Sequence, residues 1–375
     1  LKCVGQAVSG NPPQAFTKIM TEQKKNICIL PFISMDRNPY DEGLPAGPCC
    51  MYQQQQEQIF DFKSYWESQE LKDLREDFRN DRQPKGCWKC FEMESKGKKS
   101  IRQNANESRL EQHKELLQLP DEKLAPMEIK IKVGALCNLA CRMCVTNVSS
   151  RVNAVYKSIG WETLEPYKYD QDAETMLKQH ANTIRYIDVV GGEPFYNKKL
   201  LNLLQWLKDN NHSQQMTMYI TSNGMFYNSK LVELLKSFKE VVLIISLDGI
   251  GKVHEYIRPG CDFSLVESNI QKFRDYGINV LVQSTISLLN VLHLDKLDKW
   301  CAERKIHNPQ KHIVYDPKQL HPRNLPNELK LQVPQDYQKF VSEEAVDDYK
   351  IFITQLDKYW KTDIKTFMPE WEPYL

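Results

Sequence analysis

The stretch MEIKIKVGALCNLACRMC, residues 127–144, runs from an alternating apolar segment directly into three cysteines. Apolar side chains at every second position from 127 to 133 predict a half-buried β-strand. Cys137, Cys141 and Cys144 follow in the pattern CxxxCxxC. A structural zinc site usually takes four protein ligands, so this loop is one ligand short of a closed site. Three sulfurs leave a metal centre one open position, which indicates a reactive site.

Segments of the same kind recur after the cysteine loop and alternate with helical stretches. Five more strands are expected at RYIDVV (185–190), MTMYIT (216–221), VVLIIS (241–246), INVLVQSTI (278–286) and HIVY (312–315). Helices are expected between them, over residues 172–181, 198–209, 229–238, 264–276 and 294–304. Strands separated by helices predict an α/β fold with a parallel sheet, and we prefer a partial (βα)6 barrel to a doubly wound sheet.

Short polar or glycine-rich loops follow several of these strands. Besides the cysteine loop, they are GGEPF (191–195), SNG (222–224) and SLDG (246–249). In both α/β architectures the active groups lie at the carboxyl ends of the strands. We therefore expect these loops to form one site at one edge of the sheet.

The composition of the chain predicts three domains. Residues 1–125 form a small cysteine-rich domain, residues 126–318 form the barrel, and residues 319–375 form a helical cap. In the first domain, residues 64–78 predict one helix that begins with a capping box of Ser64 and Glu67. Residues 106–118 and most of 335–361 are also expected to be helical.

The charge and cysteine content indicate the setting of the protein. Lysine and arginine total 50 against 49 acidic residues among 375, so the net charge of +1 gives no argument for a nucleic-acid or membrane partner. The sequence has no run of about 18 apolar residues, and its first residues lack the apolar segment of a signal peptide. The odd total of 11 cysteines, in short spacings, favours reduced thiols and metal ligation in the cytoplasm over a disulfide scaffold.

Three cysteinates on a short loop suit a cubane [4Fe–4S] cluster, because they bind three irons and leave the fourth iron for an exogenous ligand. With a cofactor that is cleaved reductively, such as S-adenosylmethionine, this arrangement gives radical chemistry. The alternative is a set of core cysteines or part of a zinc site. The strand before the loop and the GGEPF loop after it favour the cluster.

Through these motifs, residues 126–315 resemble the radical S-adenosylmethionine (radical SAM) enzymes, whose CxxxCxxC loop matches Cys137, Cys141 and Cys144. The resemblance extends through GGEP, SNG and the run SLDG…HEYIR. It implies an oxidoreductase that binds S-adenosylmethionine and a catalytic [4Fe–4S] cluster, reduced by a donor such as flavodoxin or ferredoxin. One departure is Met143, which stands where the family often has an aromatic residue near the adenine.

The resemblance also implies the cofactor contacts. Gly191, Gly192 and Glu193 would hold the α-amino group, since glycines allow close backbone approach and a carboxylate pairs with an ammonium. The remaining candidates are Ser246 and Asp248 for the ribose, Arg258 for the carboxylate, and Asn223. Without this context SLDG is equally a capping turn, and a lone arginine is more often part of a surface ion pair.

A second cysteine set lies in the N-terminal part. Cys28, Cys49 or Cys50, Cys87 and Cys90 supply four sulfurs, which hold either zinc or an iron–sulfur cluster. Zinc as a structural staple is the plainer interpretation. However, CILPF, GPCCMY and PKGCWKCFEMESKGKKSIRQNAN resemble the twitch (half-SPASM) domain of radical SAM proteins, many of them phage-borne. This resemblance implies an auxiliary [4Fe–4S] cluster.

Together these motifs predict cleavage of S-adenosylmethionine to methionine and a 5′-deoxyadenosyl radical, which abstracts hydrogen from an unactivated C–H bond. Cys261 is a candidate hydrogen-atom donor, although a small buried thiol is the plainer interpretation. We favour a peptide substrate, because the sequence has no P-loop. The alternatives are a nucleotide, modified base or sugar substrate, and a non-catalytic binding protein with zinc staples.

Overall fold

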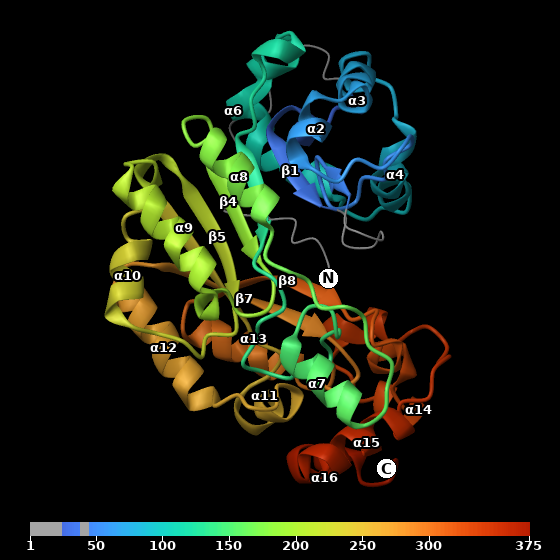
Figure 1. The fold of residues 1–375 in the computed structure, drawn as a ribbon. Helices are drawn as coiled ribbons and strands as arrows, with labels where there is room; N and C mark the ends of the chain where they lie inside the picture. The colour runs from blue at the N-terminus through green and yellow to red at the C-terminus, as the bar shows by residue number, and fades with distance from the viewer. Residues whose placement is uncertain (1–24, 38–44) are drawn as a thin grey trace. The chain divides into compact units, whose positions relative to one another are not determined.

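The computed structural model describes residues 25–37 and 45–375. The first ten residues, on which the signal-peptide expectation rests, lie outside this range. Within the described residues, eight strands form a sheet in the order β2-β1-β3-β4-β5-β6-β7-β8. Helices alternate with the strands from β3 onward (Figure 1). The expected α/β class with a parallel sheet is confirmed.

The strands from β3 to β8 are the six that the sequence predicts. The bounds are β1 Ser34–Arg37, β2 Ala46–Gly47, β3 Glu128–Lys132, β4 Tyr186–Val190, β5 Thr217–Ser222, β6 Glu240–Ser246, β7 Asn279–Ile286 and β8 His307–Ile313. β1 and β2 were not predicted, because such short strands show no alternating pattern. β8 begins at residue 307 and not at the expected residue 312, since the polar sequence HNPQKHI resembles a loop.

The chain divides into two compact units. One comprises the described part of Leu1–Ile131 together with Asp170–Asp188, and the other comprises Lys132–Tyr169 and Val189–Leu375. The division falls inside β3 and β4 and not at residue 125. Residues 319–375 belong to the second unit and do not form a unit of their own.

The first unit contains β1, β2, most of β3 and several short helices. Its α-helices are α1 Leu30–Ile33, α2 Phe62–Glu67, α3 Gln69–Arg79, α4 Trp88–Ser95, α5 Ile101–Ala105, α6 Glu111–His113 and α8 Gln171–Gln179. The single helix expected over 64–78 is wrong, because Ser68 ends α2 and caps α3 by accepting a hydrogen bond from the Leu71 amide. The expected capping box is also absent, since the Ser64 amide donates to Asp61, the cap of α2.

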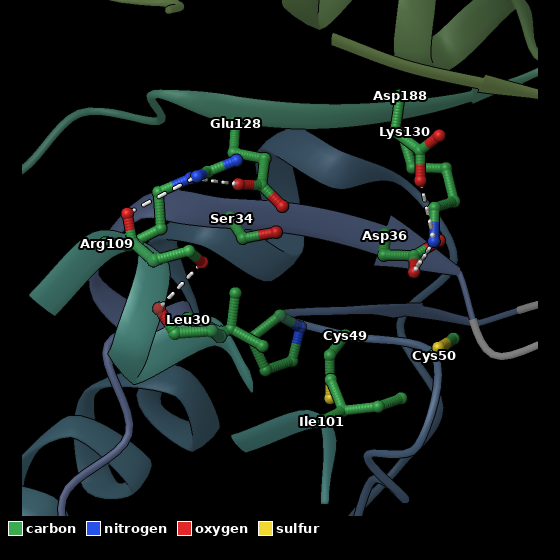
Figure 2. A pocket seen from close by; sticks show the side chains of 13 residues that line it. Leu30, Ser34, Asp36, Cys49, Cys50, Ile101, Arg109, Glu128, Lys130 and Asp188 are labelled. Carbon is green, nitrogen blue, oxygen red and sulfur yellow. Dashed lines mark hydrogen bonds and ion pairs between the residues drawn. The ribbon is translucent and has the colours of Figure 1, made fainter. Parts of the chain in front are cut away.

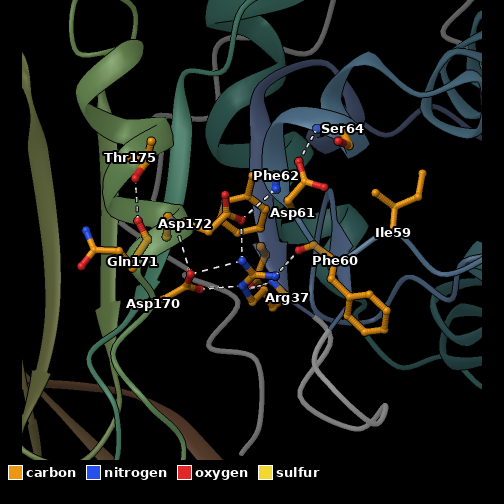
Figure 3. Close-up of polar contacts among 12 residues, drawn as sticks. Arg37, Ile59, Phe60, Asp61, Phe62, Ser64, Asp170, Gln171, Asp172 and Thr175 are labelled. Carbon is orange, nitrogen blue, oxygen red and sulfur yellow. Dashed lines mark hydrogen bonds and ion pairs between the residues drawn. The ribbon is translucent and has the colours of Figure 1, made fainter.

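Arg37 explains why α8 packs with the N-terminal part of the chain. Its Nε lies 2.7 Å from Asp170 Oδ2, and its guanidinium also pairs with Asp172 (Figure 3). Asp170 caps α8 through the Ala173 amide, and Asp172 accepts a hydrogen bond from the Phe62 amide. One guanidinium therefore joins β1 to the first turn of α8 and to the start of α2.

The second unit carries the rest of the sheet and the remaining helices. They are α7 Ser150–Ser158, α9 Lys198–Asp209, α10 Ser229–Leu235, α11 Gly251–Ile257, α12 Phe263–Asp275, α13 Leu294–Glu303, α14 Asn327–Lys330, α15 Lys350–Trp360 and α16 Ile364–Phe367. Residues 241–245 of β6 are buried without a break, as is typical of a parallel strand covered on both faces. β5 pairs in parallel with β6, and β6 with β7, so the SNG and SLDG loops leave the sheet at the same edge.

The described residues include no helix with the length and apolar character needed to cross a membrane.

Candidate active site

The cysteine loop is anchored by backbone hydrogen bonds to the end of α11. The Ala140 amide donates to the carbonyl oxygen of Pro259 at 3.3 Å, and the Arg142 amide donates to that of Ile257 at 2.9 Å. The Cys144 amide donates to the Cys141 carbonyl oxygen at 3.0 Å, which closes a turn. These bonds hold the loop beside the segment that carries Arg258.

The three thiols of the loop lie close enough to influence one another. Burial raises the pKa of Cys144 to about 11, and the neighbouring Cys137 thiol adds to this rise. Burial likewise raises the pKa of Cys141, while Arg258 opposes the rise. The Arg258 Nη1 atom lies 3.7 Å from Cys141 Sγ, where its charge favours the thiolate. Because metal ligation requires thiolates, this cation suits a metal centre bound at Cys141.

Within residues 25–37 and 45–375, no group of three or more His, Cys, Asp or Glu side chains is gathered closely enough to hold a metal ion.

The two glycines after β4 pack directly against the backbone that precedes the cysteines. The Gly192 amide donates to the Gly134 carbonyl oxygen at 2.8 Å, and the Glu193 amide donates to that of Leu136 at 2.7 Å. A Cβ atom on Gly192 would lie 2.2 Å from the Leu136 oxygen, and one on Gly191 would lie 2.8 Å from the Gly134 oxygen. Only glycine fits here, so GGEP and the cysteine loop form one rigid pair.

Glu193 accepts hydrogen bonds from two neighbouring loops. Its side chain is fully buried, and Oε1 accepts hydrogen bonds from the Ser222 hydroxyl at 2.9 Å and the Phe195 amide at 3.3 Å. Oε2 accepts one from the Asn223 amide at 2.8 Å. Burial raises the pKa of Glu193 to about 7. The carboxylate therefore ties the GGEP loop to the SNG loop, and Gly191 and Gly192 are the half-buried part of the motif.

Asp248 is likewise occupied within the protein. Its Oδ2 lies 2.6 Å from Arg258 Nε, and its Oδ1 accepts a hydrogen bond from the Thr285 amide at 2.7 Å. The Asp248 amide donates to His254 Nδ1 at 3.2 Å. With both oxygens engaged, Asp248 orients Arg258 toward Cys141. Ser246, the other residue that the sequence suggests for a ribose contact, is half-buried.

Three further candidates lie on the loops around the cysteines. The Asn223 side chain donates to Asn138 Oδ1 at 2.7 Å and so joins the SNG loop to the cysteine loop. Met143 is buried in the apolar core of the second unit. The Cys261 sulfur lies 3.8 Å from the Met225 sulfur, just after the SNG loop. Asn138 was missed by the sequence analysis, because a single asparagine between two motifs carries no pattern.

The N-terminal cysteines also form a group. Burial raises the pKa of Cys28 and of Cys87, and the neighbouring thiols of Cys49 and Cys90 raise both further. The pKa of Cys49, raised by burial to about 12, is likewise affected by Cys90. Arg102 acts in the opposite direction on Cys28, Cys87 and Cys90. The four thiols are therefore near enough to affect one another's pKa, and the Arg102 guanidinium is near enough to oppose the rise.

Cys50 does not belong to this group. It is disulfide-bonded, whereas Cys49 is a free thiol, which departs from the expectation of reduced thiols throughout. Both cysteines line a cavity of about 60 Å³. Figure 2 shows their sulfurs pointing in different directions. Lys130 in this cavity lies 3.1 Å from Asp36 and 3.2 Å from Asp188.

The chain is similar to known proteins over part of its length. Residues 131–302 match the family model of the Radical SAM superfamily. The match covers just under half of the chain, and it shows that this part is similar to radical SAM domains. Over 179 residues the chain is 27% identical to the sporulation killing factor maturation protein SkfB of Bacillus subtilis (strain 168), a match that covers 47% of this chain. The chain spans 40% of the length of that relative.

Solved structures resemble parts of the chain. The structure of anSMEcpe with bound AdoMet is 21% identical, with a TM-score of 0.42 over 51% of this chain and 53% of that one. Streptococcus suis SuiB bound to S-adenosylmethionine is 19% identical, with a TM-score of 0.40 over 75% of this chain and 61% of that one.

Proposed function

We propose that the protein is a radical SAM enzyme that cleaves S-adenosylmethionine reductively and uses the resulting 5′-deoxyadenosyl radical to abstract hydrogen from an unactivated C–H bond. The observation that carries this proposal is the cysteine loop, with its three thiols beside the Arg258 guanidinium within the radical SAM domain. The cluster, when bound, supplies the electron for the cleavage. Cys137, Cys141 and Cys144 are the residues that would hold it.

The residues around the loop have separate roles in this proposal. Gly191 and Gly192 leave room for the cofactor at the backbone, and Glu193 fixes their position from behind. Arg258, aligned by Asp248, faces the cofactor carboxylate or the cysteine thiolates. The other candidates for cofactor contact are Asn223, Ser246 and Met143. Cys261 is the candidate donor of a hydrogen atom to the substrate radical.

We further propose an auxiliary [4Fe–4S] cluster on Cys28, Cys49, Cys87 and Cys90, in a twitch-like domain. The mutual influence of the four thiols supports a shared centre, and the nearby Arg102 suits one that carries negative charge. Arg102 is held in place by Glu94 and by the Ile27 carbonyl oxygen, which is 2.7 Å from its Nη1.

A peptide is the substrate that we favour. The relative SkfB is named for the maturation of a killing factor, and such a name indicates action on another gene product. A nucleotide, modified base or sugar is the second candidate class. Flavodoxin or ferredoxin is the kind of donor that would reduce the cluster in the cytoplasm.

The experiment that tests the substrate class is anaerobic incubation of the reconstituted protein with S-adenosylmethionine, a reductant and pools of deuterated peptides or metabolites. Transfer of deuterium into 5′-deoxyadenosine from the peptide pool alone is the expected result. Transfer from the metabolite pool alone would replace the peptide with a small molecule.

A further inference from the structure

Arg142 lies between the second and third cysteines of the catalytic loop and carries a buried charge. Its side chain is 1% exposed, and its Nη2 lies 2.6 Å from Asp357 Oδ1 on α15. Nη2 also donates to Thr362 Oγ1 at 2.9 Å, and Nε donates to the Tyr256 carbonyl oxygen at 2.9 Å. The guanidinium carbon lies 3.9 Å from the centroid of the Tyr256 ring. The cysteine loop is thus fastened to a helix more than 200 residues away in the sequence.

Asp357 is the centre of this group of contacts. Its Oδ2 accepts hydrogen bonds from the Tyr256 hydroxyl at 3.2 Å and from the amide of Ile364, the first residue of α16, at 3.0 Å. Its Oδ1 also accepts one from Thr362 Oγ1 at 2.8 Å. One carboxylate therefore joins α11, α15 and α16 to the loop. A network with this many shared partners is rigid, because loss of one member leaves several buried groups unsatisfied.

The network extends to the thiols through the backbone of the loop. The Arg142 amide donates to the Ile257 carbonyl oxygen at 2.9 Å. The next residue, Arg258, is the cation that lies 3.7 Å from Cys141 Sγ. The position of Arg142 therefore affects Cys141, its neighbour in sequence, and Arg258 on the other side of the same thiol.

We propose that Asp357 and Arg142 form a positioning device for the catalytic cluster. Through this pair the C-terminal helix α15 holds the loop in the conformation in which Cys141 and Cys144 present their sulfurs together. This inference rests on the proposed function, because it requires a cluster at the loop. Residues that orient metal ligands from behind change metal affinity or activity by about 10- to 100-fold when they are replaced.

The test compares substitutions in the full-length, anaerobically reconstituted protein. Asp357→Asn removes the charge and keeps the shape, so we expect it to lose iron to a chelator about 10- to 100-fold faster than the wild type. We also expect an altered electron paramagnetic resonance signal when S-adenosylmethionine is added to the reduced protein. Asp357→Glu, which keeps the charge, should recover part of the retention. Thr362→Val keeps the ion pair between Arg142 and Asp357, so we expect it to lose iron faster than the wild type but more slowly than Asp357→Asn. This variant also provides a test if Asp357→Asn does not fold.

The matched control is Glu370→Gln. Glu370 pairs with His293 at 2.6 Å and holds the same C-terminal segment to the start of α13, without a hydrogen bond to Arg142 or Asp357. We expect this variant to lower the midpoint of thermal unfolding while it retains iron like the wild type. Equal iron loss from Glu370→Gln and Asp357→Asn, or wild-type retention and spectrum in Asp357→Asn and Thr362→Val, would overturn the positioning role. A wild type that takes up no iron at the loop would instead overturn the proposed function itself.

Discussion

The buried Glu193 carboxylate accepts three hydrogen bonds, so we expect its replacement by glutamine to destabilise the protein. In Glu193→Gln one oxygen becomes an amide nitrogen that faces a donor, the Asn223 amide or the Ser222 hydroxyl. We expect the free energy of unfolding to fall by about 1–3 kcal/mol. We also expect weaker binding of S-adenosylmethionine, because the SNG and GGEP loops lose their common anchor.

The control is Glu255→Gln, which alters a carboxylate that accepts a hydrogen bond from the Phe263 amide at 3.0 Å, outside these loops. Calorimetric titration of both variants, with the cluster verified as loaded, measures the effect. An unchanged dissociation constant in Glu193→Gln would remove Glu193 from the site.

We expect the stability of the first unit to depend on pH through the titration of Asp188. Burial raises its pKa from 3.8 to about 6; Lys130, 3.2 Å away, opposes the rise, and the carboxylates of Asp36 and Glu128 add to it. The folded protein then keeps a proton that the unfolded chain has released, so this contribution to stability is present below about pH 4 and lost by about pH 6. The shift corresponds to at most about 3 kcal/mol.

Thermal unfolding of the wild type and of Asp188→Asn between pH 4 and pH 7 checks this prediction. The difference between the two midpoints should change across the interval from about pH 4 to about pH 6. A constant difference between the proteins would show that Asp188 keeps an ordinary pKa.

At the level of the elements, the close contact between the GGEP loop and the cysteine loop requires a residue without a side chain at position 192. Gly192→Ala would place a Cβ atom 2.2 Å from the Leu136 carbonyl oxygen. Since both atoms belong to the backbone or are fixed to it, one loop has to move, at a cost of about 1–3 kcal/mol. We expect Gly192→Ala to lower both the stability and the affinity for S-adenosylmethionine.

Gly160→Ala is the control, because no atom lies within 4 Å of a Cβ there. Its φ of 77° makes alanine somewhat strained, so this variant measures the backbone cost alone. Wild-type affinity in Gly192→Ala would mean that the two loops are not rigidly coupled.

The helices and strands that could be predicted from the sequence are those in which apolar residues follow a recognisable pattern. β3 to β7 and the helices between them carry apolar residues at regular intervals or in continuous buried runs, whereas the polar start of β8 carries no such pattern and was missed. The break at Ser68 was missed because the apolar pattern continues from α2 into α3, and only the capping bond reveals the boundary. The roles of Glu193, Asp248 and Arg142 could not be predicted either, since their partners come from distant parts of the chain.

At the scale of the whole molecule, the two cysteine groups predict two clusters in one chain. Anaerobic reconstitution should give about eight irons per chain, four for each cubane. The Cys87→Ala/Cys90→Ala variant should retain about half of this iron, because the catalytic loop lies in the other unit. Four irons with one tightly held zinc in the wild type would show that the N-terminal group is a structural staple.

The most direct test of the proposed reaction is the formation of 5′-deoxyadenosine by the reconstituted, reduced protein in the presence of S-adenosylmethionine. The wild type should produce it, and Cys137→Ala, Cys141→Ala and Cys144→Ala should not, because three thiolates leave no spare ligand. The folded state of each variant is verified by circular dichroism. No 5′-deoxyadenosine from the iron-loaded wild type, or wild-type amounts from any of the three variants, would contradict the assignment.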